Sequence, residues 1–332
     1  MPDGIAQEDA EAFARSLEVS LSKGDAAPFI RAMDWSALTD RILKDIPEHR
    51  GEPAYKRNDL YQSLSKSGGI CKSIADKVTQ GGAYQFLRFK ADPPRLMFRL
   101  VDPEGGLDYH DLYLTRDSGG AIRIGEMFLY HFGETLTDGL RKTLVPEEYV
   151  GGKNSYGVMM SDVVRILFRE NVTYIQMMFS SYEEGKYQRT LDIYDSLPKE
   201  LRTTKSLQIL RLQAAQKLGD PHVYAFVLAD LRNQMAGDAC VEFLSLDYFF
   251  NHHQFGDALE CLDRIDRIVG SDVYLNVFRS MALLQTGKHE EARNRLQEAI
   301  QKEPRLRNDP TFQAMEQRLS RPIPVNRPPV GN

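Results

Sequence analysis

One stretch of the sequence carries residue types that could move a proton. Tyr109, Asp111 and Tyr113 alternate along a strand-like segment, and alternate residues of a strand point to the same face of a sheet. Glu126 and Tyr130 share a face of the next such segment. Carboxylates and phenols on neighbouring strands in an apolar pocket would serve as a general base and hydrogen-bond donors. The alternative, which we favour, is a polar cross-strand cluster that orders the sheet or docks the helical region.

Other signatures of chemistry are absent from the sequence. The histidines form no His-Glu-x-x-His motif and the cysteines no Cys-x-x-Cys motif, so no metal site is expected. The chain also has no phosphate-binding glycine loop and no serine nucleophile elbow, so no cofactor is expected. Cys240 and Cys261 fall in predicted helices and are expected to be buried free thiols.

The candidate residues belong to an α+β domain that we place at residues 1–135. The spacing of apolar residues predicts three helices, and alternating segments between turn sequences then predict four strands. The helices are expected at 8–22, from Asp25 to before residue 47, and at 57–79; the strands at 83–90, 95–102, 107–116 and 121–130. Gly68-Gly69 predicts a kink in the third helix. The short connections imply neighbouring antiparallel strands in a meander.

Both faces of the predicted sheet carry apolar residues. Leu96, Phe98 and Leu100 share one face of their strand, while Met97 and Val101 lie on the other. The second face is therefore expected to be covered by a helix, by the repeat region or by a second copy of the chain. A homodimer through the N-terminal sheet is one of these expectations.

Residues 171–306 repeat four times with a period of 34 residues, in units 171–204, 205–238, 239–272 and 273–306. One phase holds glycine in three of the units and histidine in the third: Gly185, Gly219, His253 and Gly287. Three further phases are mostly small or apolar: Thr190, Tyr224, Ala258 and Ala292; Tyr194, Leu228, Leu262 and Leu296; Leu197, Leu231, Ile265 and Ala299. Such a period is typical of stacked helix–turn–helix pairs.

Shorter segments join and close the repeats. Residues 136–170 are expected to form connecting helices and a degenerate fifth unit, because Gly151 lies one period before Gly185. Residues 307–320 are expected to form a helix that caps the open end of the stack. Residues 321–332 are rich in proline and have little to bury, which predicts an extended, flexible tail.

The last repeat unit resembles the tetratricopeptide repeat. It reads Leu-Leu-Gln-Thr-Gly-Lys-His-Glu-Glu-Ala over residues 283–292 and continues to Ala299 and Pro304. The resemblance implies an all-α, right-handed solenoid in which the first helices of the units line a groove. Thr190 and Tyr224 depart from the pattern, because the family has a small residue where its two helices cross.

The N-terminal domain resembles the cone-shaped α+β fold of the ketosteroid isomerase and nuclear transport factor superfamily. The resemblance covers residues 5–132 and rests on the order of three helices followed by a four-stranded meander. The stretch from Gly106 to Leu112, together with Gly133-Glu134, is similar to a bacterial family in which such a domain precedes helical repeats. The cone fold implies a pocket, but no catalytic residue can be carried over from it.

The first helices of the repeat units supply candidate groove residues. Tetratricopeptide proteins that grip acidic chaperone tails have Lys, Arg and Asn at fixed groove positions, and that clamp is absent here. The residues at the fifth and ninth positions of the units include Ile175, Phe179, Phe243, Asp247, Val277 and Met281. They would line a hydrophobic groove for a helix or an extended peptide, or they are core residues of slightly rotated helices.

Charge and hydropathy exclude two classes of partner. The net charge of -5 and the lack of a basic segment argue against nucleic-acid binding. No apolar run approaches the roughly 20 residues that cross a bilayer, so no membrane partner is expected. The sequence as given is expected to be cytoplasmic, or exported if a leader has been removed.

The favoured hypothesis is a non-catalytic scaffold for protein–protein interaction. Its repeats would bind an unknown protein or peptide, and its N-terminal domain would be a binding or dimerisation module. The alternative is an enzyme or small-molecule-binding protein that uses a pocket in the N-terminal domain. That alternative requires a cavity with Tyr109, Asp111 or Glu126 at its base, and it fails if side chains such as Phe86, Phe98 and Phe128 fill the space.

Overall fold

The structure is a computed structural model that describes residues 4–44, 48–49, 52–53, 57–103, 105–144, 166–167 and 170–320. The chain divides into two compact units, Met1–Val241 and Glu242–Asn332. The first unit holds a sheet, its covering helices and two helix pairs, whereas the second holds helices in its described part. The domain boundary expected near residue 135 stays a prediction.

Five helices precede the sheet where three are predicted. They are α1 (Gln7–Ser22), α2 (Ala27–Ala32), α3 (Trp35–Ile42), α4 (Arg57–Ser67) and α5 (Gly69–Thr79). The second predicted helix divides because Met33 is extended and forms a β-bridge with Ile124, after which Asp34 caps α3. The third divides at Gly68, whose φ of 67° is left-handed. The kink predicted there is a complete break.

The helices lead into an antiparallel sheet with the strand order β3-β4-β5-β6-β7. The strands are β3 (Ala83–Ala91), β4 (Pro94–Val101), β5 (Leu107–Arg116), β6 (Ile122–Leu129) and β7 (Glu134–Thr135). The predicted four-stranded meander is therefore a five-stranded sheet, because the chain turns back after β6 and pairs Thr135 with Phe128. A second correction is the two-residue pair of β1 (Glu48–His49) and β2 (Glu52–Pro53) inside the predicted loop.

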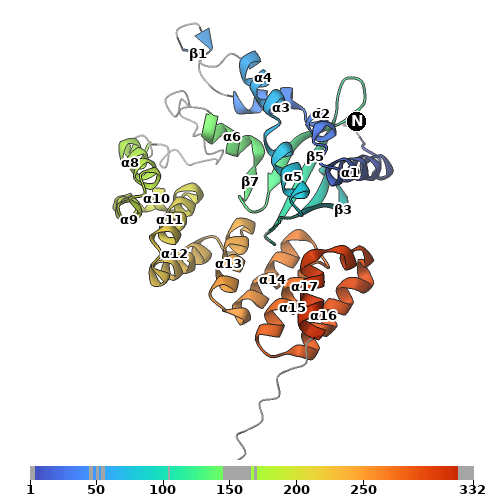
Figure 1. Ribbon diagram of the computed structural model, residues 1–332. Helices are drawn as coiled ribbons and strands as arrows, with labels where there is room; N and C mark the ends of the chain where they lie inside the picture. The colour runs from blue at the N-terminus through green and yellow to red at the C-terminus, as the bar shows by residue number, and fades with distance from the viewer. Residues whose placement is uncertain are drawn as a thin grey trace, which may run out of the picture. The chain divides into compact units, whose positions relative to one another are not determined.

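One face of the sheet forms the hydrophobic core with the N-terminal helices (Figure 1). Helix α1 packs across β3 and β4, α5 packs on β3, and α3 packs on β6. Leu96 and Phe98 are fully buried in this core, and each such side chain contributes about 1.5–3 kcal/mol through loss of water contact. Met97, on the opposite face, is also fully buried, so both faces are covered.

The first unit continues after the sheet with α6 and two helix pairs. Its helices are α6 (Leu136–Leu144), α8 (Val172–Glu183), α9 (Tyr187–Ser196), the short α10 (Lys199–Arg202), α11 (Lys205–Leu218) and α12 (Pro221–Gln234). Helix α9 packs against both α8 and α11, and α11 packs against α12. Of the degenerate fifth unit predicted within residues 136–170, the structure describes α6 and residues 166–167 and 170; the remainder, including Gly151, lies outside the described residues.

The second unit is a run of packed helices (Figure 1). They are α13 (Ala239–Asn251), α14 (Phe255–Val269), α15 (Leu275–Gln285), α16 (His289–Lys302), the 3-10 helix η2 (Pro304–Asn308) and α17 (Pro310–Ser320). Helix α15 packs against α14 and α16, and α17 packs against both α15 and α16. Phe312, Met315 and Leu319 of α17 are buried. The tail expected at 321–332 lies outside the described residues.

The period of 34 residues is visible in the helix positions. The second helices α9, α12, α14 and α16 begin at residues 187, 221, 255 and 289. The turn residue before each has a left-handed φ: 74° at Gly185, 79° at Gly219, 57° at His253 and 76° at Gly287. All twelve side chains at the three small or apolar phases are buried. The four predicted units are therefore four helix pairs in one register.

Replacing Gly287 with alanine should destabilise the protein by about 1 kcal/mol, because L residues are strained at left-handed φ. A Cβ at Gly287 would meet nothing within 4 Å, so the cost comes from the backbone alone. Gly256→Ala in α14 is the matched control, since a Cβ there is equally free and φ is not left-handed. The control should stabilise by roughly 0.5 kcal/mol. Urea unfolding measures both effects, and equal effects would contradict the assignment of the turn.

Candidate functional site

The five predicted proton-transfer residues lie on the face of the sheet that is turned away from the hydrophobic core. The strand register places Tyr113 of β5 opposite Glu126 of β6. Tyr130 follows β6 and donates its backbone N–H to the carbonyl of Tyr109 at 3.0 Å. Asp111 lies between Tyr109 and Tyr113 on the same face. None of the five belongs to the core cluster, so they cannot form the base of a pocket between the sheet and its helices.

Asp111 is the centre of this group. Its Oδ2 accepts hydrogen bonds from Nε of Arg95 at 3.0 Å and from the hydroxyl of Tyr130 at 3.1 Å. The Arg95 guanidinium lies over the ring of Tyr113, 5.7 Å from its centroid. The Asp111 side chain is 4% exposed, and an ion pair removed from water depends on such added hydrogen bonds. The remaining oxygen, Oδ1, is buried and meets no donor among the described residues.

The phenols around Asp111 stay protonated at neutral pH. Burial raises the pKa of Tyr130, and the negative charge of Asp111 raises it further. Burial also raises the pKa of Tyr113, and the negative charge of Asp111 raises it further. Tyr109 is fully buried and packs edge-on against the ring of Tyr130. With Arg95 as counter-ion and a phenol as donor, the carboxylate has the geometry of a cross-strand polar cluster.

Glu126 serves the start of α6 instead of joining Asp111. Its carboxylate accepts hydrogen bonds from the backbone N–H of Thr137 at 3.3 Å and from the Thr137 hydroxyl. Arg41 of α3 lies 3.3 Å from the same carboxylate. An acid at this position satisfies N–H groups that the first turn of a helix leaves unpaired. The structure thus gathers four of the five candidates and assigns Glu126 to a cap.

The core face holds a hydrogen-bonded chain that sequence reasoning missed. The hydroxyl of Tyr84 lies 3.1 Å from Nδ1 of His110, and Nε2 of His110 lies 3.3 Å from Oδ2 of Asp108. Oδ1 of Asp108 accepts the backbone N–H groups of Tyr109 and His131. Asp108 and His110 are two residues apart on one strand, a spacing that could have revealed the pair. The part played by Tyr84 depends on the sheet register.

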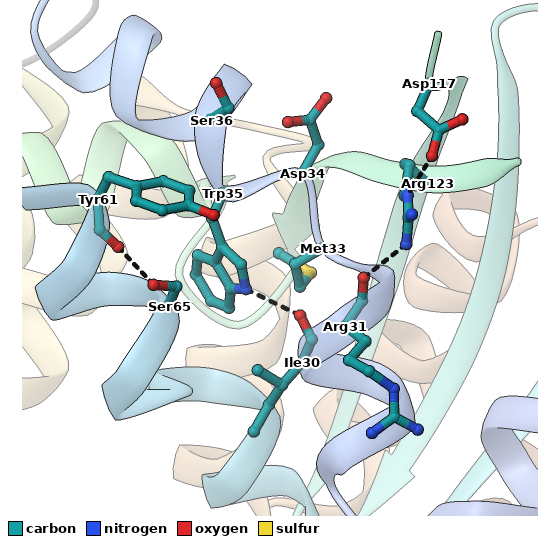
Figure 2. Close-up of a pocket in the computed structure, with 10 residues that line it drawn as sticks. All are labelled: Ile30, Arg31, Met33, Asp34, Trp35, Ser36, Tyr61, Ser65, Asp117 and Arg123. Carbon is teal, nitrogen blue, oxygen red and sulfur yellow. Dashed lines mark hydrogen bonds and ion pairs between the residues drawn. The ribbon is translucent and has the colours of Figure 1, made fainter. Parts of the chain in front are cut away.

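A cavity of about 470 Å³ lies beside Trp35, the only tryptophan of the chain. Figure 2 shows its wall, which comes from α2, α3, α4 and the turn between β5 and β6. Tyr61 of α4 faces Trp35 across part of the opening. The volume suits a small ligand. None of the five predicted residues lines this cavity.

Most polar groups in the wall of this cavity already have partners. Nε1 of Trp35 donates to the carbonyl of Ile30 at 2.8 Å. Arg123 donates to the carbonyl of Arg31 and to Asp117, both at 2.8 Å. Figure 2 shows the Asp34 carboxylate and the Arg31 guanidinium pointing in opposite directions. The wall therefore presents no converging acid–base pair.

The described residues offer neither a metal cluster nor a reactive thiol. No group of three or more His, Cys, Asp or Glu side chains among them could hold a metal ion. All three cysteines are free and buried, as expected for Cys240 and Cys261. Burial raises the pKa of the Cys71 and Cys240 thiols to about 12, so both are protonated at neutral pH and are poor nucleophiles.

Within the described part of the chain, no helix could span a membrane.

The candidate groove residues divide between the interior and the surface. The fifth-position residues Ile175, Phe243 and Val277 are buried, Phe179 and Met281 at the ninth position are half-buried, and Asp247 is exposed. Ile175 belongs to a core cluster with Met178 and Tyr194. The fifth position of this helix therefore serves the interior and does not line an open groove.

No protein-family model, curated protein or solved structure matches the chain. The two family resemblances therefore stay predictions. The function has to be argued from the residues and their geometry.

Replacing Arg95 with methionine should destabilise the protein by about 2–3 kcal/mol, because it leaves the buried Asp111 carboxylate without its counter-ion. Arg15→Met is the control. Arg15 pairs with Glu11 on the exposed surface of α1, where such a pair is worth at most about 0.5 kcal/mol. Chemical unfolding of both variants checks the difference. A loss below about 1 kcal/mol for Arg95→Met would show that the cluster does not hold the sheet.

Proposed function

We propose that the chain is a non-catalytic interaction protein whose helix pairs bind a protein partner. The observation that carries the proposal is the constant period of the pairs, whose second helices begin at residues 187, 221, 255 and 289. Helix pairs of this length are the units of solenoids, which present extended surfaces to other proteins. The likeness of residues 283–292 to the tetratricopeptide repeat supports the same interpretation.

Exposed apolar side chains on the helix pairs supply contact points for such a partner. Tyr174 of α8 is 53% exposed, and Phe226 of α12 is 66% exposed. Aromatic side chains of this kind supply a large share of the binding energy at protein interfaces. The Arg211 guanidinium lies over the Phe226 ring, 5.9 Å from its centroid, so the expected interface at this point combines an aromatic anchor with a positive charge.

A small-molecule-binding protein is the second candidate, and the cavity beside Trp35 is the observation that favours it. Its volume is suitable, but the residues expected to do chemistry do not line it. Phe98 is fully buried and Phe86 packs against the same core, so these two aromatic side chains occupy part of the space expected for a cone pocket. Phe128 is not in that core and packs against Tyr130 instead. A homodimer through the N-terminal sheet stays a prediction.

The combined variant Tyr174→Asp and Phe226→Asp should lose the partner while remaining folded, because both side chains are exposed. The measurement is affinity capture from the native lysate, with quantitative mass spectrometry of the captured proteins. Val19→Asp is the control, since Val19 is 52% exposed on α1. We expect a protein that the wild type and Val19→Asp retain in similar amounts and the double variant retains at least about tenfold less. Capture that is identical in all three would contradict the proposal.

A metabolite screen tests the second candidate, because a ligand in the cavity would alter the environment of Trp35. We expect the library to leave both the Trp35 fluorescence and the melting temperature unchanged. Tyr61→Ala, which removes part of the cavity wall, is the matched variant. A compound that shifts both signals in the wild type and not in Tyr61→Ala would favour a small-molecule-binding function over the scaffold.

A further inference from the structure

A second cavity, of about 430 Å³, lies in the first unit where one helix pair meets the next. Its wall comes from α9, the short helix α10 with the residue that follows it, α11 and α12. Three cations line it, Lys199, Arg202 and Arg211, beside a single carboxylate, Asp230. Three positive charges and one negative charge leave the wall with a net charge of about +2 at neutral pH.

Arg211 forms an ion pair with the one carboxylate of the wall, Asp230. Its Nη1 donates to Oδ2 of Asp230 at 2.6 Å, and its side chain is 10% exposed. Asp195 lies 3.8 Å from Arg211, but it is 63% exposed, so water screens its charge. Lys199 and Arg202 form no ion pair within 4 Å with a described carboxylate.

Lys199 and Arg202 have no acceptor for their side-chain donors within the described chain. Nε of Arg202 is shut off from water and still meets no oxygen. Arg202 nevertheless lines the cavity, so its positive charge acts on a ligand there. Lys199 is exposed and can approach a ligand as a mobile point charge.

The wall is held in place before any ligand arrives. The backbone carbonyl of Arg202 accepts hydrogen bonds from the hydroxyl of Tyr194 at 2.7 Å and from Nε2 of Gln208 at 3.0 Å. The guanidinium of Arg211 stacks on the ring of Tyr194, 4.6 Å from its centroid. Binding to such a preorganised wall loses little conformational entropy.

The positive charges act on the one acid of the wall. Burial pushes the pKa of Asp230 upward, but hydrogen bonds from Gln234 and Arg211, together with the charges of Arg211 and Arg202, lower it overall. Asp230 therefore stays ionised in mildly acidic solution. Arg202 and Arg211 thus both act on one carboxylate, and the wall keeps a net charge of about +2.

We propose that this cavity binds a dianionic phosphoryl group carried by a larger ligand. The net charge of about +2 in the wall matches two negative charges, whereas a single carboxylate would leave one positive charge over. Arginine and lysine are the side chains that bind phosphoryl oxygens best, one as a fork of donors and the other as a point charge. The cavity also leaves room for the organic part of a phosphomonoester. This inference goes beyond the proposed function and does not depend on it.

Calorimetric titration of the full chain with O-phospho-L-serine at pH 7.5 and low salt tests the proposal. We expect Arg202→Gln and Lys199→Gln each to weaken binding by about tenfold, the usual effect of losing a charged hydrogen bond. Lys217→Gln, which removes an exposed cation of α11 outside the cavity, should change the affinity less than about twofold. Circular dichroism and urea unfolding should give the same result for all three variants.

The pH dependence identifies the ligand group. A phosphomonoester loses its second charge below its second pKa of about 6, so binding should weaken by roughly tenfold between pH 7.5 and pH 5. Sulfate keeps both charges over that range and should bind equally at both values. Asp230, whose pKa is lowered, stays ionised over this range. If a short phosphoserine peptide binds more tightly than phosphoserine itself, the natural ligand is a phosphorylated protein. If the two bind equally, the natural ligand is a free phosphomonoester.

Three results would overturn the proposal: no binding of phosphoserine, equal binding by Arg202→Gln and the wild type, or equally tight binding of acetate. None of them bears on the partner of the helix pairs, because no protein partner is present in these titrations. Loss of the captured protein in the double aspartate variant does not test phosphoserine binding, because no phosphoserine is present in the capture. Phe226 does not line the cavity, but its ring centroid lies 5.9 Å from the Arg211 guanidinium, so the double variant is not used in the titrations.

Discussion

The helix pairs depend on one backbone conformation. The second helix of every pair follows a turn residue with left-handed φ, which is glycine in three units and His253 in the other. The turn fixes where the second helix begins, and residues five, nine and twelve positions later consequently point into the interior. His253 shows that the required feature is the backbone angle and not glycine itself. A non-glycine residue accepts that angle at a cost of about 1 kcal/mol.

The sheet obeys a different constraint, because both of its faces are buried. Buried polar groups of β5 therefore depend on partners within the protein, although Oδ1 of Asp111 and the Thr115 hydroxyl meet none among the described residues. Asp111 meets Arg95 and Tyr130 on one face, while His110 meets Tyr84 and Asp108 on the other. A slip of one residue between strands would exchange the two faces and break both sets of hydrogen bonds. The polar residues that resemble a catalytic group thus fix the strand register.

Local periodicity explains how much of the fold could be predicted. The 34-residue period recurs in four units, so the helix pairs can be predicted from it. Alternation of side chains along segments such as β5 likewise predicts the four main strands. The division of the second helix could not be predicted, because it depends on the bridge between Met33 and Ile124, which are distant in sequence. The fifth strand is only two residues long and carries too little pattern to be recognised.

The candidate site was harder to predict than the fold, because it depends on contacts between residues that are distant in sequence. Alternation placed Tyr109, Asp111 and Tyr113 on one face, but it could not show that Arg95 would neutralise the carboxylate. Alternation also could not show that Glu126 differs in role from the residues around Asp111, because Glu126 caps a helix that begins after the sheet. The two cavities combine side chains from several elements, and only the folded chain brings those elements together. The spacing of the candidate groove residues was equally ambiguous, because residues that line a groove and residues that form a core can have the same spacing.

The surplus of positive charge at the second cavity belongs to one junction and not to the repeat as such. Arg279 occupies the same phase as Arg211 and is equally buried. Its guanidinium, however, contacts both Asp263 at 2.9 Å and Asp266 at 3.0 Å, so its charge is fully compensated. Both arginines are buried, whereas the same phase holds Met177 and Ser245 in the other two units. What distinguishes the first junction is α10, whose Lys199 and Arg202 line the cavity while its one acid, Glu200, does not. Binding specificity there follows from residues that the repeat does not constrain.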